Sequence, residues 1–326
     1  MSLPSALVSI IVPAYNAELY LAETLRSVLA QTWPWIEIIV INDGSRDGTM
    51  SVAASFADPR IKLINQPNGG AAAARNRGLQ EARGEFMQFL DADDLLAPDK
   101  LERQLTRLIP SGAGVVATCP WHRFIHDPAQ SWVKPEPFWN DSAPVDWLTA
   151  CWERNSMMHP AAWLLPRALA EQAGPWDETL SLDDDGEYFT RVVLASGQIL
   201  FCAETATWYR SCLPSSLSGR RSPRALDSGL RSCEAATGAL LARENSDRTR
   251  RACVRRLQEY IYATYPDCPD LVARAERRVC ELGGGQFAPQ GGRFFRLGRT
   301  LLGWRAAKRL QRLIQGWTVP WRAKRS

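Results

Sequence analysis

Short apolar runs alternate with helical patterns over the first third of the chain. β-Branched and other apolar residues predict four strands, at Val8–Val12, Ile36–Ile41, Ile61–Ile64 and Phe86–Leu90. The 3.6-residue period of apolar positions predicts the helices between them, at Ala17–Gln31, Gly48–Phe56 and Ala71–Ala82. Because the strands are apolar throughout, they favour an α/β protein whose parallel sheet is covered by helices on both faces.

The rest of the chain is less regular. Between Pro120 and Trp152 the pattern breaks down among aromatics and prolines, which predicts a loop-rich excursion. An apolar run, a helix and two short strands follow, at Ala161–Leu165, Asp184–Ala195, Ile199–Cys202 and Thr207–Arg210. After Pro223 we expect three helices and then a glycine-rich hinge before a basic tail, the helices at Arg224–Arg243, Arg248–Ala263 and Leu271–Leu282 and the hinge at 283–292.

The composition narrows the class of protein. With 326 residues, 45% of them hydrophobic and 23% charged, the chain can bury a sizeable core, which excludes intrinsic disorder and a small disulfide-bonded scaffold. The eight cysteines include no CxxC pair and there are three histidines, so we expect reduced thiols rather than a zinc site. The start does not look like a secretory leader, and no apolar run approaches the roughly 20 residues that span a bilayer. We therefore expect a cytoplasmic protein.

The charge is concentrated at one end. The net charge is +4, but ten of the 39 Lys and Arg residues follow Glu281 and no acid does, so residues 1–281 carry a net charge of −6. At helical spacing the tail separates an apolar face from a basic face: Leu302, Ala306, Leu310, Leu313 and Trp317 against Arg305, Lys308, Arg309 and Arg312. This layout predicts a helix that lies in the headgroup plane of an anionic membrane, on its cytoplasmic face.

Two other interpretations of the tail stay open. Its apolar face could pack on the rest of the protein or on a second subunit. A nucleic-acid-binding arm is disfavoured, because an arm that binds phosphates needs no apolar face. We expect no nucleic-acid partner.

Polar clusters follow three of the predicted strands, at 13–16, 42–49 and 91–94, where ligands of parallel sheets bind. In the last cluster Asp91 and Asp93 alternate along an extended segment and point the same way. Clustered carboxylate oxygens are what a hard divalent cation requires. A turn whose aspartates cap a helix beginning near Pro98 explains the same residues equally well.

The other clusters suit a nucleotide. Asp43 could accept hydrogen bonds from a nucleobase or ribose, beside glycines that allow a ligand to approach closely. The loop Asn68–Gly70 leads into a small-residue helix that carries Arg75 and Arg77. Such a helix suits a site near phosphates, and it also suits ordinary packing with solvated arginines.

Taken in order, these motifs closely resemble the family 2 glycosyltransferases of the GT-A fold. The segments that carry the resemblance are Ser9–Asn16, Asp43–Ser45, Asp47–Thr49, Asn68–Gly70, Arg75–Gly78 and Asp91–Asp94. The match covers residues 7 to about 210. It implies a Rossmann-like, mostly parallel sheet with helices on both faces, within a GT-A domain at 1–220. That domain would have a nucleotide-sugar-binding half at 1–118 and an acceptor-side half at 119–220, followed by a helical extension at 221–282 and the hinge and tail at 283–326.

The resemblance also implies roles for single residues. Pro13, Tyr15 and Asp43 would hold the base and ribose of the donor, and Arg75 would lie near the nucleotide. Asp91–Asp94 would be the DxD element, in which Asp91 and Ala92 bind the donor. Asp93 would be the closest ligand of Mn²⁺ or Mg²⁺.

A candidate base comes from a second acidic stretch. Gly174–Glu178 and Asp183–Arg191 resemble the family's Asp-Glu turn and its acidic pair six residues before an arginine. Counting back from Arg191 selects Asp185 as the catalytic carboxylate, although the run of aspartates leaves Asp184 one position away. Acidic residues at a helix start explain the run without catalysis.

Acceptor-side contacts are expected from three residues, Trp176, Asp184 and His159. For His159 a satisfied structural histidine is the stronger interpretation. Together these features predict an inverting glycosyltransferase that takes a nucleotide sugar, a UDP-sugar first, and a glycan or lipid-linked acceptor of cell-surface polysaccharide synthesis. A non-catalytic nucleotide-sugar-binding protein of the same fold is the alternative, and the presence of both Asp93 and Asp185 argues against it.

Overall fold

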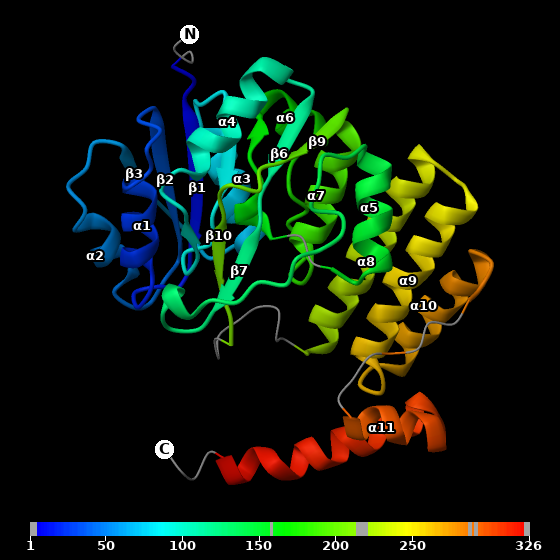
Figure 1. Ribbon diagram of the computed structural model, residues 1–326. Helices are drawn as coiled ribbons and strands as arrows, with labels where there is room; N and C mark the ends of the chain where they lie inside the picture. Colours follow the sequence, from blue (N-terminus) through cyan, green and yellow to red (C-terminus); the bar gives the residue numbers. More distant parts are fainter. Residues whose placement is uncertain (1–4, 157–158, 213–220, 286–288, 290–292, 323–326) are drawn as a thin grey trace.

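A five-stranded sheet lies at the centre of the computed structural model, which describes residues 5–156, 159–212, 221–285, 289 and 293–322. The strand order is β3-β2-β1-β4-β8 (Figure 1), with bounds β1 Val8–Ala14, β2 Ile36–Asp43, β3 Ile61–Gln66, β4 Phe86–Phe89 and β8 Leu165–Pro166. Strands β3, β2, β1 and β4 are parallel to one another, whereas β8 pairs with β4 in the antiparallel sense. The predicted mostly parallel sheet is confirmed.

Helices cover both faces of this sheet because alternate strand residues point to opposite sides. In β1, Ile10 packs into one core with helices α1 (Leu21–Leu29) and α4 (Lys100–Ser111), whereas Ile11 packs into the other with α3 (Ala71–Glu81). The short helix α2 (Thr49–Ala54) follows β2. The predicted two-sided layering is therefore confirmed.

The second half of the α/β domain adds two small sheets and two helices. Strand order is β5-β10-β7 in one sheet and β6-β9 in the other, with bounds β5 Leu95–Leu96, β6 Val115–Thr118, β7 Trp121–Phe124, β9 Gln198–Phe201 and β10 Thr207–Arg210. The helices are α6 (Arg167–Ala173) and α7 (Asp184–Ala195), and single turns of 3₁₀ helix occur at Pro128–Gln130 and Pro160–Ala162. The helix α7 buries Phe189 and Val192 in the core that contains β4.

The loop-rich excursion predicted between Pro120 and Trp152 is wrong in part. That stretch contains β7 and also helix α5 (Pro144–Glu153). The helix begins with proline at its first position, where no backbone N–H is needed, and it buries Trp147, Leu148, Cys151 and Trp152 on one face. The high density of aromatics along the whole stretch concealed this helical period in the sequence.

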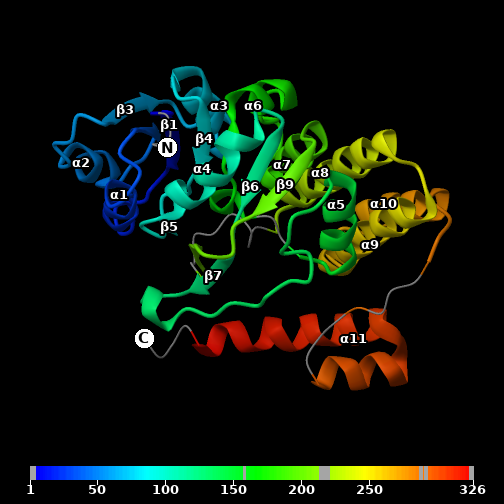
Figure 2. The same cartoon turned by 45° about the horizontal axis from the view of Figure 1, so that its top comes forward.

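The three helices predicted after Pro223 are confirmed, as α8 (Pro223–Arg243), α9 (Asp247–Thr264) and α10 (Pro269–Glu281). They lie at the end of the molecule opposite α1 and α2 in both views (Figure 1, Figure 2). Helix α8 packs along α7 and α9 packs along α5. Side chains of the extension, such as Leu240 and Ala252, enter the same core as Trp152, so the extension is built into the α/β domain.

The tail forms helix α11 (Arg293–Arg322), but the helix is broken at Gly303, whose φ is 78°. The predicted apolar face is therefore not continuous, since Leu302 precedes the break and Leu310 follows it. Two of the predicted basic residues face the body of the protein: Arg305 pairs with Glu276, and Arg312 pairs with Asp267 at 2.6 Å.

The leucines of the tail point away from the body. Leu301 is 71% exposed, and the other exposed large apolar side chains of α11 are Leu297, Leu302, Leu310 and Leu313. Within the described residues, the apolar face thus does not pack on the rest of the chain. The side chain of Trp317 and part of the predicted hinge lie outside the described residues.

Two further expectations concern cysteines and membrane spans. In the structure each of the eight cysteines is a free thiol. Over the part of the chain that the structure describes, no helix combines the length and the apolar character needed to cross a bilayer.

Candidate functional site

The loops that follow β1 and β2 are joined to each other. The backbone N–H of Asn16 donates to Oγ of Ser45 (3.0 Å), and the N–H of Arg46 donates to Oδ1 of Asn16 (2.9 Å). Pro13 lies near the end of β1, and Tyr15, the first residue after the strand, is 46% exposed. The two strand ends therefore present one connected surface with an accessible aromatic ring.

Asp43, the last residue of β2, holds the loop that precedes α3. Its Oδ1 accepts hydrogen bonds from the N–H of Gly69 (2.8 Å) and from Nε2 of Gln66 (2.8 Å), and its Oδ2 accepts from the N–H of Gly70 (2.9 Å). The side chain is buried, so both carboxylate oxygens have partners inside the protein. In this arrangement Asp43 positions the glycine loop at the strand-end surface.

Arg75 connects the two acidic stretches of the sequence. Its Nη2 donates to Oδ1 of Asp91 and its Nη1 donates to Oδ2 of Asp184, both at 2.8 Å. Its side chain is 5% exposed, and its guanidinium lies over the ring of Trp176, 4.4 Å from the centroid. Burial alone would lower the pKa of Arg75, but the two carboxylates outweigh burial and raise it. This arginine therefore stays charged and brings the Asp91 turn against the start of α7.

Asp93 has no such partner in the part of the chain that the structure describes. Burial, and then the negative charge of Asp91, raise the pKa of Asp93 to about 7, although Arg210 acts in the opposite direction. Among the described residues no Lys, Arg or His pairs with its carboxylate. A carboxyl group in this state gains from either a proton or a cation.

Asp94, the next residue, is fully buried. Its Oδ1 accepts from the N–H of Arg210 (2.8 Å), whereas its Oδ2 has no hydrogen-bond partner in the described part of the chain. Burial and the neighbouring Asp93 and Asp91 raise its pKa well above the usual range. Ala92 is also buried, and its carbonyl oxygen accepts from Oγ1 of Thr24, so this residue contributes the shape of the turn rather than a free polar group.

The turn fits a divalent cation that other ligands would complete. In the described residues no three His, Cys, Asp or Glu side chains are arranged to hold a metal ion by themselves. Mg²⁺ and Mn²⁺ are commonly bound through one or two carboxylates, with water and substrate phosphates as the other ligands. Asp93, whose carboxylate pairs with no Lys, Arg or His of the described chain, fits the role of such a ligand.

Asp185 stands at the start of α7, partly exposed. Burial, and then the charges of Asp184 and Asp183, raise the pKa of Asp185 to about 8, against a lowering effect of Arg75. Its Oδ1 accepts from the N–H of Gly186 (2.9 Å), and no described cation pairs with it. Asp184 is bound to Arg75, so of these two candidates Asp185 is the carboxylate left free to exchange a proton.

Trp176 and His159 lie inside the protein. Trp176 is 2% exposed and stacks on Tyr188, with ring centroids 4.0 Å apart. Nε2 of His159 lies 3.7 Å from Oδ2 of Asp94, and burial lowers the pKa of His159 to about 3. Both side chains are buried, Trp176 beside Arg75 and His159 beside Asp94. In this conformation neither is accessible for the predicted contact with an acceptor.

Sequence reasoning missed Arg210 at the end of β10. Its Nε donates to the carbonyl oxygen of Asp93 (3.0 Å), and its Nη2 reaches Oε2 of Glu23 (2.5 Å). The arginine is buried and so braces the whole Asp91–Asp94 turn. The sequence offered one indication of this role, an arginine at the end of the short strand-forming run Thr207–Arg210.

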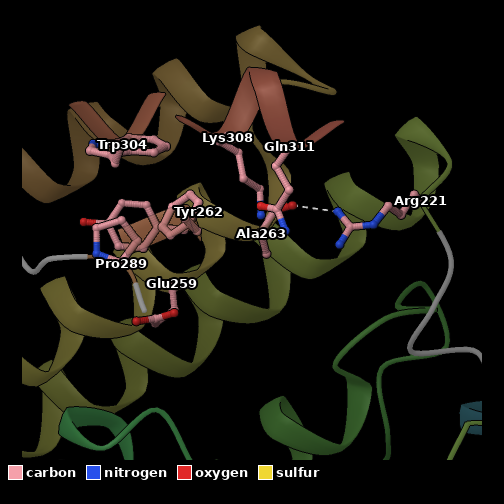
Figure 3. Close-up of a pocket in the computed structure, with 9 residues that line it drawn as sticks. Arg221, Glu259, Tyr262, Ala263, Pro289, Trp304, Lys308 and Gln311 are labelled. Carbon is pink, nitrogen blue, oxygen red and sulfur yellow. Dashed lines mark hydrogen bonds between the residues drawn. The ribbon is translucent and has the colours of Figure 1, made fainter. Parts of the chain in front are cut away.

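A cavity of about 290 Å³ lies between α9 and α11, away from these strand ends. Figure 3 shows Lys308 and Gln311 of α11 pointing toward Tyr262 of α9, with Arg221 beside them. Within the described residues Lys308 has no hydrogen-bond partner. Burial, and then the charges of Arg312 and Arg221, lower its pKa. An anion would relieve this repulsion between cations.

Comparison with known proteins identifies the family. The model of glycosyl transferase family 2 matches residues 9–172, half of the chain. The chain belongs to this family. An uncharacterised glycosyltransferase of Rickettsia typhi is 34% identical over 196 residues, 59% of this chain and 60% of that relative. A putative teichuronic acid biosynthesis glycosyltransferase of Bacillus subtilis is 40% identical over 134 residues, 37% of this chain and 53% of that one. The chain thus spans less than two thirds of either relative.

Solved structures agree on the fold of this family 2 member. The structure of S. aureus TarS 1–349 in complex with UDP-GlcNAc superposes with a TM-score of 0.61, covering 94% of this chain and 92% of that one at 16% identity. The same fragment in complex with UDP gives a TM-score of 0.62. The predicted GT-A fold is confirmed.

Proposed function

We propose that this protein is a metal-dependent, inverting glycosyltransferase that moves a sugar from a UDP-sugar to a hydroxyl of a glycan or lipid-linked acceptor in cell-surface polysaccharide synthesis. The family assignment supports transfer, the UDP-GlcNAc held by S. aureus TarS supports the donor, and the B. subtilis relative's teichuronic acid name supports the acceptor class. The observation that carries the proposal is the pair of ion pairs made by Arg75. They join the Asp91 turn to the start of α7, which bears Asp185.

The donor would lie along the joined strand ends. The accessible ring of Tyr15 can pack on the nucleobase, with Pro13 shaping the floor beneath it. Asp43 would act mainly by holding the Gly69–Gly70 loop, whose backbone borders the same edge. Asp91 and Ala92 would then border the diphosphate.

Asp93 would hold Mn²⁺ or Mg²⁺ beside that diphosphate, and the bound ion would neutralise the charge that develops on the leaving nucleoside diphosphate. Arg75 is committed to two carboxylates, so it would set the separation between donor and base rather than bind phosphate directly.

Asp185 would take the proton of the acceptor hydroxyl. As the acceptor oxygen bonds to C1 of the sugar, the bond from C1 to the diphosphate oxygen breaks on the opposite side, which inverts the anomeric centre. The hydroxyl proton moves to a carboxylate oxygen of Asp185, whose raised pKa suits a general base near neutral pH. One carboxylate suffices here, in contrast to the pair used by glycoside hydrolases.

A screen of nucleotide sugars tests the proposal. Purified full-length protein with Mn²⁺ should release nucleoside diphosphate from a UDP-sugar, and chelation of the metal should stop the release. Failure with UDP-, GDP- and dTDP-sugars in the presence of glycan and lipid-linked acceptors would reject the proposal. If calorimetry then still detected UDP binding, the non-catalytic alternative would stand.

We also propose that the tail attaches the enzyme to the cytoplasmic face of an anionic membrane. Because Arg305 and Arg312 bind the body, they turn the leucines of α11 outward, where they can enter the headgroup region. Each base near an anionic surface contributes about 1 kcal/mol, which salt screens.

Vesicle flotation tests the attachment. The full chain should float with anionic vesicles at low salt, and the double variant Leu310→Gln with Leu313→Gln should float less. Leu19→Gln removes a leucine outside the tail that is even more exposed, and it should change nothing. Equal flotation by the full chain and by a chain ending at Gly283, or flotation by neither, would refute the proposal.

A further inference from the structure

The residue before α7 has an unusual backbone conformation. Asp183, the N-cap of the helix, has φ 62° and ψ 27°, in the left-handed region that residues other than glycine seldom adopt. Asp184 and Asp185 follow directly, so the direction of both carboxylates depends on this turn. Such a conformation persists when surrounding contacts determine it.

Those contacts come from the helical extension. Nη2 of Arg256 in α9 donates to Oδ2 of Asp183 at 2.7 Å. The hydroxyl of Ser232 in α8 lies 2.7 Å from both the carbonyl oxygen and Oδ2 of Asp183. One turn earlier in α8, Oγ of Ser228 accepts from the N–H of Ser181 at 2.7 Å. Residues far along the chain thus hold the whole approach to α7.

The arrangement is tightly packed around Arg256. Its guanidinium is largely buried and lies over the ring of Trp152 in α5, 4.9 Å from the centroid. A Cβ at Gly186 would stand 2.3 Å from Oδ1 of Asp183 and 2.8 Å from Nη2 of Arg256. Only glycine leaves room for this ion pair under the first turn of α7.

We propose that Arg256 and Ser232 are positioning residues of the transferase, which hold Asp183 in its left-handed turn and thereby direct the carboxylate of Asp185. The inference rests on the proposed function of Asp185. It assigns the extension a part in catalysis, because residues outside the matched family region 9–172 then determine where the base points.

Arg256 also balances the charge around Asp185. Within the described residues, the carboxylates that raise the pKa of Asp185 are those of Asp183 and Asp184 at its own helix start and of Asp91 in the turn after β4. Two cations oppose them, Arg75 from α3 and Arg256 from α9. Loss of the positive charge at position 256 should make the ionised form of Asp185 harder to reach, so its pKa should rise.

The test compares Arg256→Gln with Arg251→Gln in the full-length protein. Arg251 lies on the same helix and ties it to α5 through Glu153 (2.8 Å), so its loss removes the same charge and a similar bridge without touching Asp183. For Arg256→Gln we expect kcat to fall on the order of 10- to 100-fold, the scale of a small misplacement of a reacting group. The donor KM should stay close to wild type, and the acidic limb of the kcat–pH profile should move to higher pH. Arg251→Gln should change none of these.

Two milder variants keep the proposal testable if Arg256→Gln unfolds. Arg256→Lys keeps the charge, so it should keep the wild-type acidic limb and recover part of the turnover. Ser232→Ala should lower kcat several-fold without moving the limb. Thermal unfolding of each variant checks that the fold persists. A wild-type kcat and a wild-type acidic limb in Arg256→Gln would overturn the proposal. If Arg256→Gln unfolds, a wild-type kcat in Ser232→Ala would overturn it. Losses in Arg251→Gln equal to those in Arg256→Gln would overturn it as well.

A measurement without turnover separates this inference from the proposed function. Carboxyl ¹³C NMR can follow the titration of Asp185 in the wild type and in Arg256→Gln. An inactive wild type would reject the transferase, whereas an unchanged pKa of Asp185 in the variant would reject the role of Arg256.

Discussion

The turn Asp91–Asp94 and the helix start Asp183–Asp185 share one arrangement on two unrelated elements. In each, Arg75 binds one carboxylate: Asp91 in the turn and Asp184 in the helix start. A second carboxylate in each is held by another arginine, Asp94 through the backbone N–H of Arg210 and Asp183 through the side chain of Arg256. The third, Asp93 or Asp185, has no cation partner among the described residues, and its pKa is raised to about 7 or about 8.

The difference between the two clusters lies in what surrounds the free carboxylate. Asp93 is on a turn at a strand end, where a diphosphate can supply further ligands to a shared cation. Asp185 is on the first turn of α7, where its two neighbouring carboxylates already have partners: Asp184 binds Arg75 and Asp183 binds Arg256. Neighbouring arginines, rather than residue type, thus decide which aspartate of each run is left without a cation partner among the described residues.

The strongest test of this assignment is Asp93→Asn. We expect the variant to lose transfer entirely at all Mn²⁺ concentrations while it keeps its thermal stability, because an amide is a poor ligand for a hard cation and carries no charge. Asp58→Asn, in a surface pair with Arg60, serves as the matched control and should transfer normally. Turnover near that of wild type in the presence of Mn²⁺ would show that the metal assignment is wrong.

Asp185→Asn should give the next largest effect. The variant should bind donor almost normally yet lose on the order of 10² to 10⁴ in turnover, the usual range for a positioned proton acceptor. Asp184→Asn breaks an ion pair of the buried Arg75, so its main effect should be on stability. A reversed result, with Asp184→Asn the severe variant in turnover, would move the base by one residue.

Gly186→Ala tests the packing that supports the helix start. Alanine favours helix over glycine by roughly 1 kcal/mol in general, but here its Cβ meets Asp183 and Arg256. We expect about a tenfold loss of kcat and a lower melting temperature. Gly238→Ala, in α8 with open space around it, should instead stabilise the protein and leave kcat unchanged. A stabilised and fully active Gly186→Ala would argue that the ion pair beneath it is dispensable.

The smallest effect should be a pH-dependent gain in stability of Asp185→Asn. The pKa of Asp185 is about 8 in the folded protein and near 4 in an unfolded chain, so ionisation is disfavoured by folding. The resulting loss of stability should be absent below about pH 4 and grow until the pH passes about 8. Calorimetry should therefore find that Asp185→Asn melts a few degrees above wild type at pH 8. At pH 4 the variant and the wild type should melt at the same temperature. If Asp185→Asn and the wild type melted at the same temperature at pH 8 as well as at pH 4, folding would not disfavour the ionised form of Asp185.

The sequence by itself determined the layers of the fold and the location of both acidic clusters. Apolar periodicity follows directly from helix and strand geometry, so β1 to β4 and the helices α7 to α10 could be predicted from local pattern alone. The order of four motifs was specific enough to indicate the family. The helix α5 was not predicted, because the high density of aromatics around it hides the helical period of its apolar residues.

Only the tertiary structure decided which aspartate in each cluster is free. Arg75 meets Asp184 across 109 positions of the chain, and Arg256 meets Asp183 across 73. Such pairings depend on how α3 and α9 pack against α7, and nothing in the spacing of the residues encodes that distance. A run of aspartates looks uniform in sequence because its members differ only in their neighbours, and the pKa of each carboxyl is set by burial and by those neighbours.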